Sequence, residues 1–122
     1  MPRSLADVLR TIGEVADFSD IPVTDANALG LFKNRPLHIA AVWGDCEAIE
    51  ILVQAGASID QRGEHDFTPL MEATAQGNLA ACQLLVALGA RPIPNDEGQS
   101  PSEYAAASDE GELSDWLRAK GL

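Results

Sequence analysis

The sequence contains Thr68-Pro69-Leu70-Met71-Glu72-Ala73-Thr74-Ala75-Gln76-Gly77, and similar segments lie on both sides of it. The proline of this segment recurs 33 residues earlier as Pro36 and 32 residues later as Pro101. Glycines recur with the same spacings, at Gly56, Gly89 and Gly121. Proline and glycine that each keep one phase over a period of this length predict a repeat protein built from stacked helical units.

Each unit predicts a pair of helices joined by a turn. Proline in the first turn of a helix loses no hydrogen bond, since that N–H has no partner there. Thr68 and Ser100, which directly precede two of the prolines, are suited to cap those helices. Glycines are expected to end the first helices, at Gly44 and Gly77, and the second helices, at Gly56 and Gly89.

These segments resemble the ankyrin repeat family, whose units share a Thr-Pro-Leu-His-x-Ala core and a period of about 33 residues. The closest matches are Pro36-Leu37-His38-Ile39-Ala40-Ala41 and Thr68-Pro69-Leu70, and the resemblance covers residues 30 to 122. The chain departs from the family pattern at Arg35, Met71 and Asp109, which stand where the family has threonine, histidine and glycine. The resemblance implies an all-α solenoid of about three helix-turn-helix repeats with short turn or hairpin loops. It also implies a small, freestanding ankyrin repeat protein of bacterial type.

The residues before the repeats predict a helix that caps the stack. Apolar residues follow the helical period at Leu5, Val8, Leu9 and Ile12. Ser4 and Asp7 have the spacing of a capping box, so we expect an amphipathic helix over residues 4–16. A second short helix is expected after Thr24. The predicted organisation is one folded domain, with the capping helix and a connection at 1–30 and repeats at about 31–63, 64–95 and 96–122.

The composition predicts a cytoplasmic protein. No apolar run reaches the roughly 18 residues of a membrane span, and the charges of Arg3, Asp7 and Arg10 rule out a secretory signal. Cys46 and Cys82 lie in different units, without a neighbouring cysteine or histidine at metal spacing. We expect them to be small buried hydrophobic residues in a reducing compartment.

The net charge of −11 excludes some classes of partner. Nucleic acid and anionic membranes both require clusters of lysine and arginine. An excess of acid either keeps a small protein dispersed in water or recognises a basic protein. The position of the acidic residues within the repeat distinguishes these two interpretations.

The sequence offers little catalytic chemistry, and we predict no enzyme activity, cofactor or metal. It has no phosphate-binding glycine loop, no cysteine pair and no His-Glu-x-x-His motif. The resemblance gives His38 a structural role, in which the imidazole bonds to the backbone near a turn, and His65 falls at an exposed turn tip. A convergent polar pocket around His38 and Glu72 with shifted pKa values would instead indicate an enzyme or a ligand-binding regulator.

The resemblance also marks a surface for a partner. In ankyrin-like stacks the first helices and the protruding turns form a concave face. The candidate contact residues on this sequence are Phe32, Asn34, Trp43, Glu64, His65, Phe67, Glu72, Gln76, Asp96, Glu97 and Gln99. Beside them lie Leu31, Val42, Ala75, Glu103, Ala107 and Ser108.

Two features of this surface suggest what it binds. Trp43 and Phe67 are aromatic where the fold does not require it, which is typical of an interface hot spot, although Trp43 could instead pack under the N-terminal segment. Trp116 is different, because its phase places it in the core. Acidic residues gather on the same face, at Glu64, Glu72, Asp96, Glu97 and Glu103, with Lys33 and Arg35 only at its edge.

The sequence therefore predicts a module, expected to be monomeric, that binds one basic protein partner through the concave face. An inhibitor or immunity protein that neutralises a basic enzyme, such as a nuclease toxin, has this character. The alternative is a general adaptor or scaffold subunit whose acidic charge serves only solubility.

Overall fold

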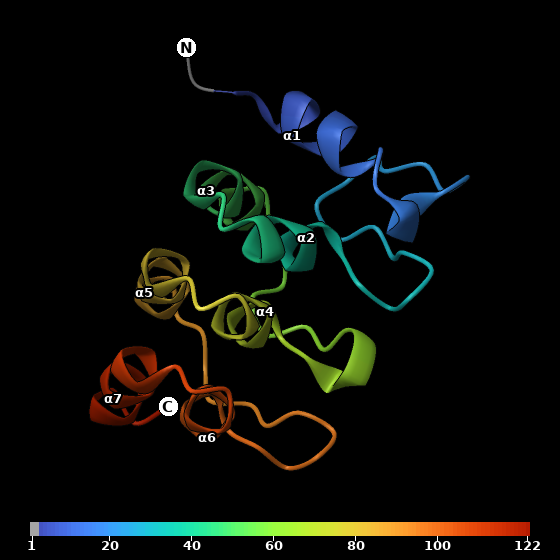
Figure 1. Cartoon of the computed structure of the whole chain (residues 1–122). Coiled ribbons are helices and arrows are strands. Elements are labelled where there is room, and N and C mark those ends of the chain that lie inside the picture. Colours follow the sequence, from blue (N-terminus) through green and yellow to red (C-terminus); the bar gives the residue numbers. More distant parts are fainter. Residues whose placement is uncertain (1–2) are drawn as a thin grey trace.

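The computed structural model describes residues 3–122, and over these residues it contains seven α-helices, two short 3-10 helices and no strand (Figure 1). The helices pair as α2 (Pro36–Trp43) with α3 (Cys46–Gln54), α4 (Pro69–Ala75) with α5 (Leu79–Ala87), and α6 (Pro101–Ala107) with α7 (Gly111–Ala119). Figure 1 shows α2, α4 and α6 in one column, α3, α5 and α7 in a second, and loops that project from the first. The predicted all-α stack of three helical pairs is confirmed.

The helix ends follow the predicted signals. The hydroxyl of Thr68 accepts a hydrogen bond from the Met71 amide at 3.2 Å, and that of Ser100 accepts one from the Glu103 amide at 3.3 Å. Gly44 ends α2 with a φ of 67°, in the left-handed region that glycine occupies without a steric penalty. The equivalent residues Gly77 and Asp109 also have positive φ, so Asp109 takes up the glycine conformation despite its side chain.

The side chain of Arg35, at the position of the missing threonine, makes no capping bond, and the ring of His38 instead binds backbone groups around the start of α2. The Arg35 amide donates to Nδ1 of His38 at 3.0 Å, and Nε2 lies 2.8 Å from the Gln61 carbonyl and 2.9 Å from the Phe67 carbonyl. Because Nδ1 accepts, Nε2 carries the proton and donates to both carbonyls. Burial lowers the pKa of His38, which keeps the ring neutral. The predicted structural role of His38 is confirmed, and the ring joins α2 to the loop before α4.

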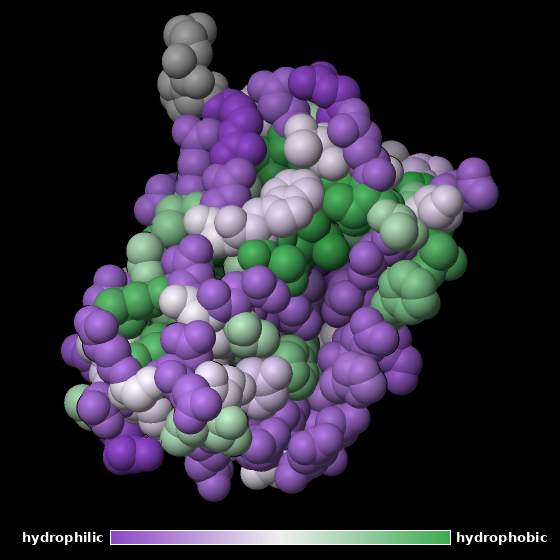
Figure 2. Space-filling view, in the orientation of Figure 1, coloured by the Kyte–Doolittle hydropathy of each residue, from purple (hydrophilic) through white to green (hydrophobic). Residues whose placement is uncertain are grey.

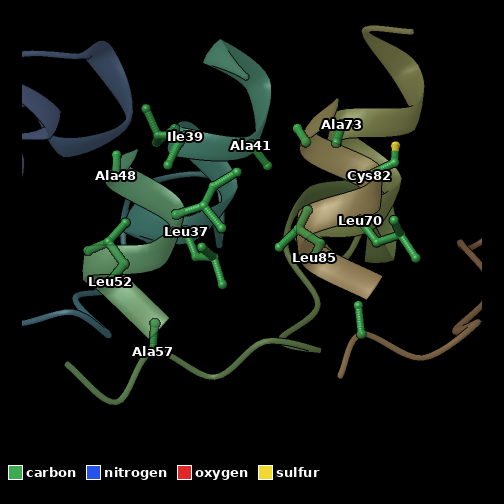
Figure 3. Packing of buried hydrophobic residues seen from close by; sticks show 14 of the residues in the cluster. Leu37, Ile39, Ala41, Ala48, Leu52, Ala57, Leu70, Ala73, Cys82 and Leu85 are labelled. Atoms are coloured by element: carbon green, nitrogen blue, oxygen red, sulfur yellow. The ribbon is translucent and has the colours of Figure 1, made fainter. Parts of the chain in front are cut away.

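The core runs continuously through the stack. Figure 3 shows Leu37 and Leu52 of the first pair and Leu70 and Leu85 of the second among its buried side chains. Cys82 is fully buried, and burial raises the pKa of its thiol to about 11. The predicted burial is thus confirmed for Cys82, whereas Cys46 is only half-buried.

Trp116 lies at the margin of the core rather than inside it. Its side chain is partly buried against the core cluster, and the Lys120 ammonium lies 6.0 Å from the ring centroid. The equivalent residues Ile51 and Leu84 are partly buried in the same way. The prediction that Trp116 is equivalent to Ile51 and Leu84 is therefore correct, but this position of the second helix lies at the edge of the core and not inside it.

The capping helix α1 (Leu5–Ile12) packs on α3 and α2 and buries Val8, Leu9 and Ile12. The predicted capping box is present, with the Ser4 hydroxyl and the Asp7 carboxylate each accepting from the other residue's amide. The helix is shorter than predicted, because it ends at Gly13 and the chain continues into a 3-10 helix, η1 (Ala16–Phe18). Residues 1 and 2 of the predicted N-terminal unit lie outside the described part.

The helix predicted after Thr24 is wrong. The Asn27 amide donates to the Asp25 carboxylate at 2.7 Å, which makes a turn. The Asn27 side chain donates to the Gly56 carbonyl at 3.0 Å and accepts from the Ser58 amide at 2.9 Å. These two bonds tie the connection to the loop that follows α3, and they compete with a local helix.

Candidate protein-binding surface

Three hairpin loops project from the first helices, and we name them hairpin 1 (30–34), hairpin 2 (63–67) and hairpin 3 (95–99). In each, the amide of the first residue donates to the carbonyl of the last, at 2.8, 2.8 and 3.0 Å. Hairpin 2 contains the second 3-10 helix, η2 (Glu64–Asp66). The three-residue tips are Leu31-Phe32-Lys33, Glu64-His65-Asp66 and Asp96-Glu97-Gly98. Together with α2, α4 and α6, the hairpins form the surface that we call the inner face.

Hydrogen bonds join the hairpins into a row. The Asn34 side chain accepts from the Glu64 amide at 3.1 Å and donates to the Asp17 carboxylate at 3.0 Å. The Asp96 amide donates to the His65 carbonyl at 3.0 Å, and the His65 ring lies 3.4 Å from the Asp96 carboxylate. The bonds of Asn34, a predicted contact residue, lie within the fold and position hairpin 2.

Gln99 has a similar position in hairpin 3. Its Oε1 accepts from the Asn95 side chain at 3.1 Å, and Oδ1 of Asn95 accepts from the amides of Glu97 and Gln99 at 3.0 Å. Gln99 is half-buried, so this predicted contact residue also serves the shape of its hairpin. Gln76, by contrast, is exposed next to the end of α4.

The two aromatic candidates differ in their surroundings. Trp43, the last residue of α2, is 43% exposed, so the N-terminal segment does not cover it. Phe67 is half-buried and packs edge-on against Tyr104, with ring centroids 5.4 Å apart. Only Trp43 therefore has the free aromatic surface expected of both.

Large exposed apolar side chains lie at hairpin 1 and at the far end of α2. Leu29 at 53%, Leu31 at 58% and Phe32 at 49% exposure lie in or beside hairpin 1, and Trp43, at 43%, is the last residue of α2. Figure 2 shows hydrophobic surface over α2 and the loop before it, whereas the loops of the lower units are mainly hydrophilic. The repeat phase predicts all of these residues as surface positions except Leu29, which lies before the first phased position.

Carboxylates occupy the other two tips. Glu64, Asp66, Asp96 and Glu97 are all exposed. Asp66 is not among the predicted contact residues, although it has the same phase as Lys33 and Gly98 and shares their positive φ. Glu103 differs from these acids, because it accepts from the Ser100 amide and this bond holds the pKa of its carboxyl below the usual range.

Glu72 is a predicted contact residue whose carboxyl is partly removed from water. Glu72 lies on α4, is half-buried, and its pKa is raised to about 7. Burial is the main cause, the charges of Glu64 and Asp17 add to it, and His65 opposes them. The raised pKa therefore reflects mainly the partial removal of this carboxyl from water, and the two nearby carboxylates strengthen the effect.

Replacing Glu72 by glutamine is expected to raise the melting temperature at pH 8 and to change it little at pH 4. The folded chain keeps the proton up to a pKa of about 7, whereas an unperturbed glutamate releases it near 4.5. The stability linked to this proton is present below pH 4.5 and is lost as the pH rises through 7. Thermal unfolding of both proteins across this range would measure the effect.

The control for this prediction is Glu103→Gln. The pKa of Glu103 is lowered in the folded chain, so its charge stabilises the protein above the unperturbed pKa, and the variant is expected to be less stable than the parent at pH 8. If both variants changed the melting temperature at pH 8 by the same amount and in the same direction, the raised pKa of Glu72 could not be the cause.

The polar groups do not converge on His38 and Glu72. Hollows of about 270 Å³ and 200 Å³ lie between hairpins 1 and 2 and between hairpins 2 and 3, and neither residue lines them. Both ring nitrogens of His38 are bonded to backbone. Within residues 3–122 no cluster of His, Cys, Asp and Glu is suited to a metal ion.

Helix pairs stacked in this way, with a row of hairpins along one side, define a helical repeat protein. The chain belongs to the ankyrin repeat family, because a family model described as ankyrin repeats in three copies matches residues 14–96 and 37–121. The matched residues include all three helical pairs and the three hairpins.

Relatives carry this region within longer proteins. The ADP-ribosylation factor GTPase-activating protein AGD2 of Arabidopsis thaliana is 39% identical over 79 residues, which are 61% of this chain and 10% of that protein. Protein phosphatase 1 regulatory subunit 27 of Homo sapiens is 41% identical over 68 residues, 55% of this chain and 44% of the relative. The tyrosine-protein kinase Shark of Drosophila melanogaster is 31% identical over 93 residues, 75% of this chain and 10% of the kinase. The chain thus corresponds to less than half of each of these relatives.

No helix within residues 3–122 is long and apolar enough to cross a membrane.

Proposed function

We propose that this chain is a non-catalytic, monomeric protein-interaction module that binds one basic protein partner through the inner face. The observation that carries the proposal is the row of exposed carboxylates on hairpins 2 and 3, together with the exposed ring of Trp43 at the end of α2. Complementary charge would speed the encounter and select the partner. Burial of Trp43 and its apolar neighbours would supply much of the binding energy. The proposal takes residues 1–122 as one domain, with repeats at 31–63, 64–95 and 96–122, in the cytoplasm, where its two free cysteines would stay reduced.

Trp43→Ala is expected to weaken partner binding by more than about 1 kcal/mol, which is about fivefold in Kd, because a half-exposed tryptophan loses its water on binding. The melting temperature should change little. Trp116→Ala is the matched control, since that ring packs against the core and its loss should lower the melting temperature instead. The hot-spot role fails if Trp43→Ala lowers the melting temperature as much as Trp116→Ala and leaves Kd unchanged.

The double variant Glu64→Lys, Glu97→Lys is expected to slow association several-fold at low salt, with a smaller effect at high salt, because surface charges steer the encounter and salt screens them. The control is Glu50→Lys with Glu112→Lys, which changes the net charge equally on exposed positions of α3 and α7. Stopped-flow association with the partner, captured from the source cell and identified by mass spectrometry, provides the measurement. If both double variants slowed association equally, the effect would come from the net charge and not from the position of the carboxylates on the inner face.

The finer form of the proposal is an inhibitor or immunity protein, from a bacterium, that neutralises a basic enzyme such as a nuclease toxin. The net charge of −11 and the acidic tips support it. If the captured partner is an enzyme, equimolar addition of this chain should abolish its activity, and Trp43→Ala should restore part of it. Capture of a partner whose activity persists in the complex would contradict this form.

An adaptor or scaffold subunit is the second candidate, and the relatives favour it. In the GTPase-activating protein and the kinase, the region similar to this chain is a tenth of a larger protein. Under this proposal the acidic residues serve solubility, so partner capture should persist unchanged at high salt and in the Glu64→Lys, Glu97→Lys variant.

A further inference from the structure

The tips of the three hairpins differ in chemistry along the row. Hairpin 1 presents two exposed apolar side chains, Leu31 and Phe32, together with Lys33. Hairpins 2 and 3 present the four exposed carboxylates of Glu64, Asp66, Asp96 and Glu97. The row is therefore apolar and cationic at one end, and anionic over the remaining two thirds.

Hairpin 1 is held firmly although its tip is exposed. The Leu31 amide donates to the Asp17 carbonyl at 2.6 Å, and the Arg35 guanidinium donates to the Asn27 carbonyl at 2.7 Å. Gly30 is buried so closely that a Cβ there would lie 2.8 Å from the Asp17 carbonyl oxygen. A partner that covers Leu31 and Phe32 would gain their burial without having to order the loop.

The hollow between hairpins 1 and 2 joins the two chemistries. It measures about 270 Å³, and Leu31, Phe32 and Lys33 line one side of it while Glu64 and His65 line the other. An apolar side chain placed here would cover Phe32, and a cation further along the partner would reach Glu64. Lys33 disfavours a second cation on the side of the hollow that hairpin 1 lines.

We infer that the partner presents an extended segment in which one bulky apolar side chain docks on hairpin 1 and lysine or arginine residues, on one side of it, dock on hairpins 2 and 3. This inference rests on the function proposed above and specifies the partner. Packed helices lie about 10 Å apart, so the hairpins should follow one another at about that distance. An extended chain advances about 3.3 Å per residue. The basic residues are therefore expected about three and about six positions from the apolar one.

A peptide-display selection with the full chain tests this pattern. Random 12-residue peptides selected at low salt should show a bulky apolar residue with lysine or arginine about three and six positions away on one side. Leu31→Ser with Phe32→Ser should remove only the preference at the apolar position. Asp96→Asn with Glu97→Gln should remove only the distal basic preference. Leu29→Ser is the control, because Leu29 is equally exposed but does not line the hollow.

The strongest selected peptide then gives a quantitative check by fluorescence anisotropy. Replacing its apolar residue with serine should raise Kd at least about fivefold, and so should Phe32→Ser, but the two changes together should not multiply, since they remove the same contact. If the two changes multiplied their effects on Kd, the apolar residue of the peptide would not contact Phe32, and its assignment to hairpin 1 would be overturned. Unchanged melting temperatures of the variants exclude unfolding as the cause.

The outcomes separate this inference from the proposed function. Enrichment of basic residues without an apolar position, or without fixed spacing, overturns the inference and leaves a basic partner in place. Enrichment of neutral or acidic peptides overturns both. The absence of any enrichment overturns the extended segment, whereas salt-sensitive capture of a folded basic protein would still support the proposed function.

Discussion

Replacing His38 by alanine is expected to lower the free energy of unfolding by at least about 3 kcal/mol. The ring is completely buried, and it accepts from the Arg35 amide while donating to the carbonyls of Gln61 and Phe67. Alanine would leave the Arg35 amide and the Gln61 carbonyl without this partner, whereas the Phe67 carbonyl would keep the Gly63 amide. It would also open a cavity between α2 and the loop before α4. Urea unfolding followed by circular dichroism provides the measurement.

His38→Met separates the hydrogen bonds from the packing. Methionine occupies the equivalent buried position in the second unit, at Met71, so its side chain suits this place in the stack. The variant should fill the space and still lose about 2 kcal/mol for the unpaired backbone groups. A variant as stable as the parent would show that the bonds of His38 contribute little.

The pH dependence gives a second control for His38. Burial lowers its pKa below the unperturbed 6.5, so the unfolded chain binds the proton first as the pH falls. The stability that neutral His38 contributes is present above pH 6.5 and declines as the pH falls toward the folded pKa. Neither His38 variant should show this part of the acid destabilisation.

Gly44→Ala is expected to lower the free energy of unfolding by about 2 to 3 kcal/mol. The backbone of Gly44 is left-handed, with a φ of 67°, and an added Cβ would overlap the side-chain nitrogen of Asn78. Asn78 caps α5 by accepting from the Ala81 amide at 2.9 Å. The substitution would therefore strain one unit and displace the cap of the next.

Gly98→Ala is the matched control, because its φ of 76° is close to that of Gly44 and nothing lies within 4 Å of the added Cβ. This variant carries the backbone strain alone, about 1 to 2 kcal/mol. Chemical unfolding of both variants should show the larger loss for Gly44→Ala. Equal losses would mean that Asn78 moves aside without cost.

The repeat architecture was predictable because its signals are local. Pro69, Thr68 and Gly77 act on the backbone within a few residues, and each behaves as the sequence indicates. The absence of a helix after Thr24 was not predictable, since Asn27 bonds to backbone 29 and 31 residues away. A hydrogen bond to a residue so far along the chain is not indicated by the local sequence pattern.

The candidate surface was predictable to a similar extent. The repeat phase placed Glu64, His65, Asp96 and Glu97 at exposed tips. It gave no sign that Phe67 would pack on Tyr104, because that contact depends on how adjacent units stack. The raised pKa of Glu72 has the same origin, since the charges that contribute to it come from separate segments of the chain.

The closure of the hairpins has a consequence for how this protein can evolve. The bonds that shape them use backbone groups and the side chains of Asn34 and Asn95, which lie outside the tips. Tip side chains such as Phe32 and Glu97 can therefore mutate with little effect on folding. Selection can retarget the protein to a new partner by substitutions at the tips, while the stack that carries them stays unchanged. The constrained tip positions are Lys33, His65, Asp66 and Gly98, because their positive φ favours glycine, asparagine or aspartate.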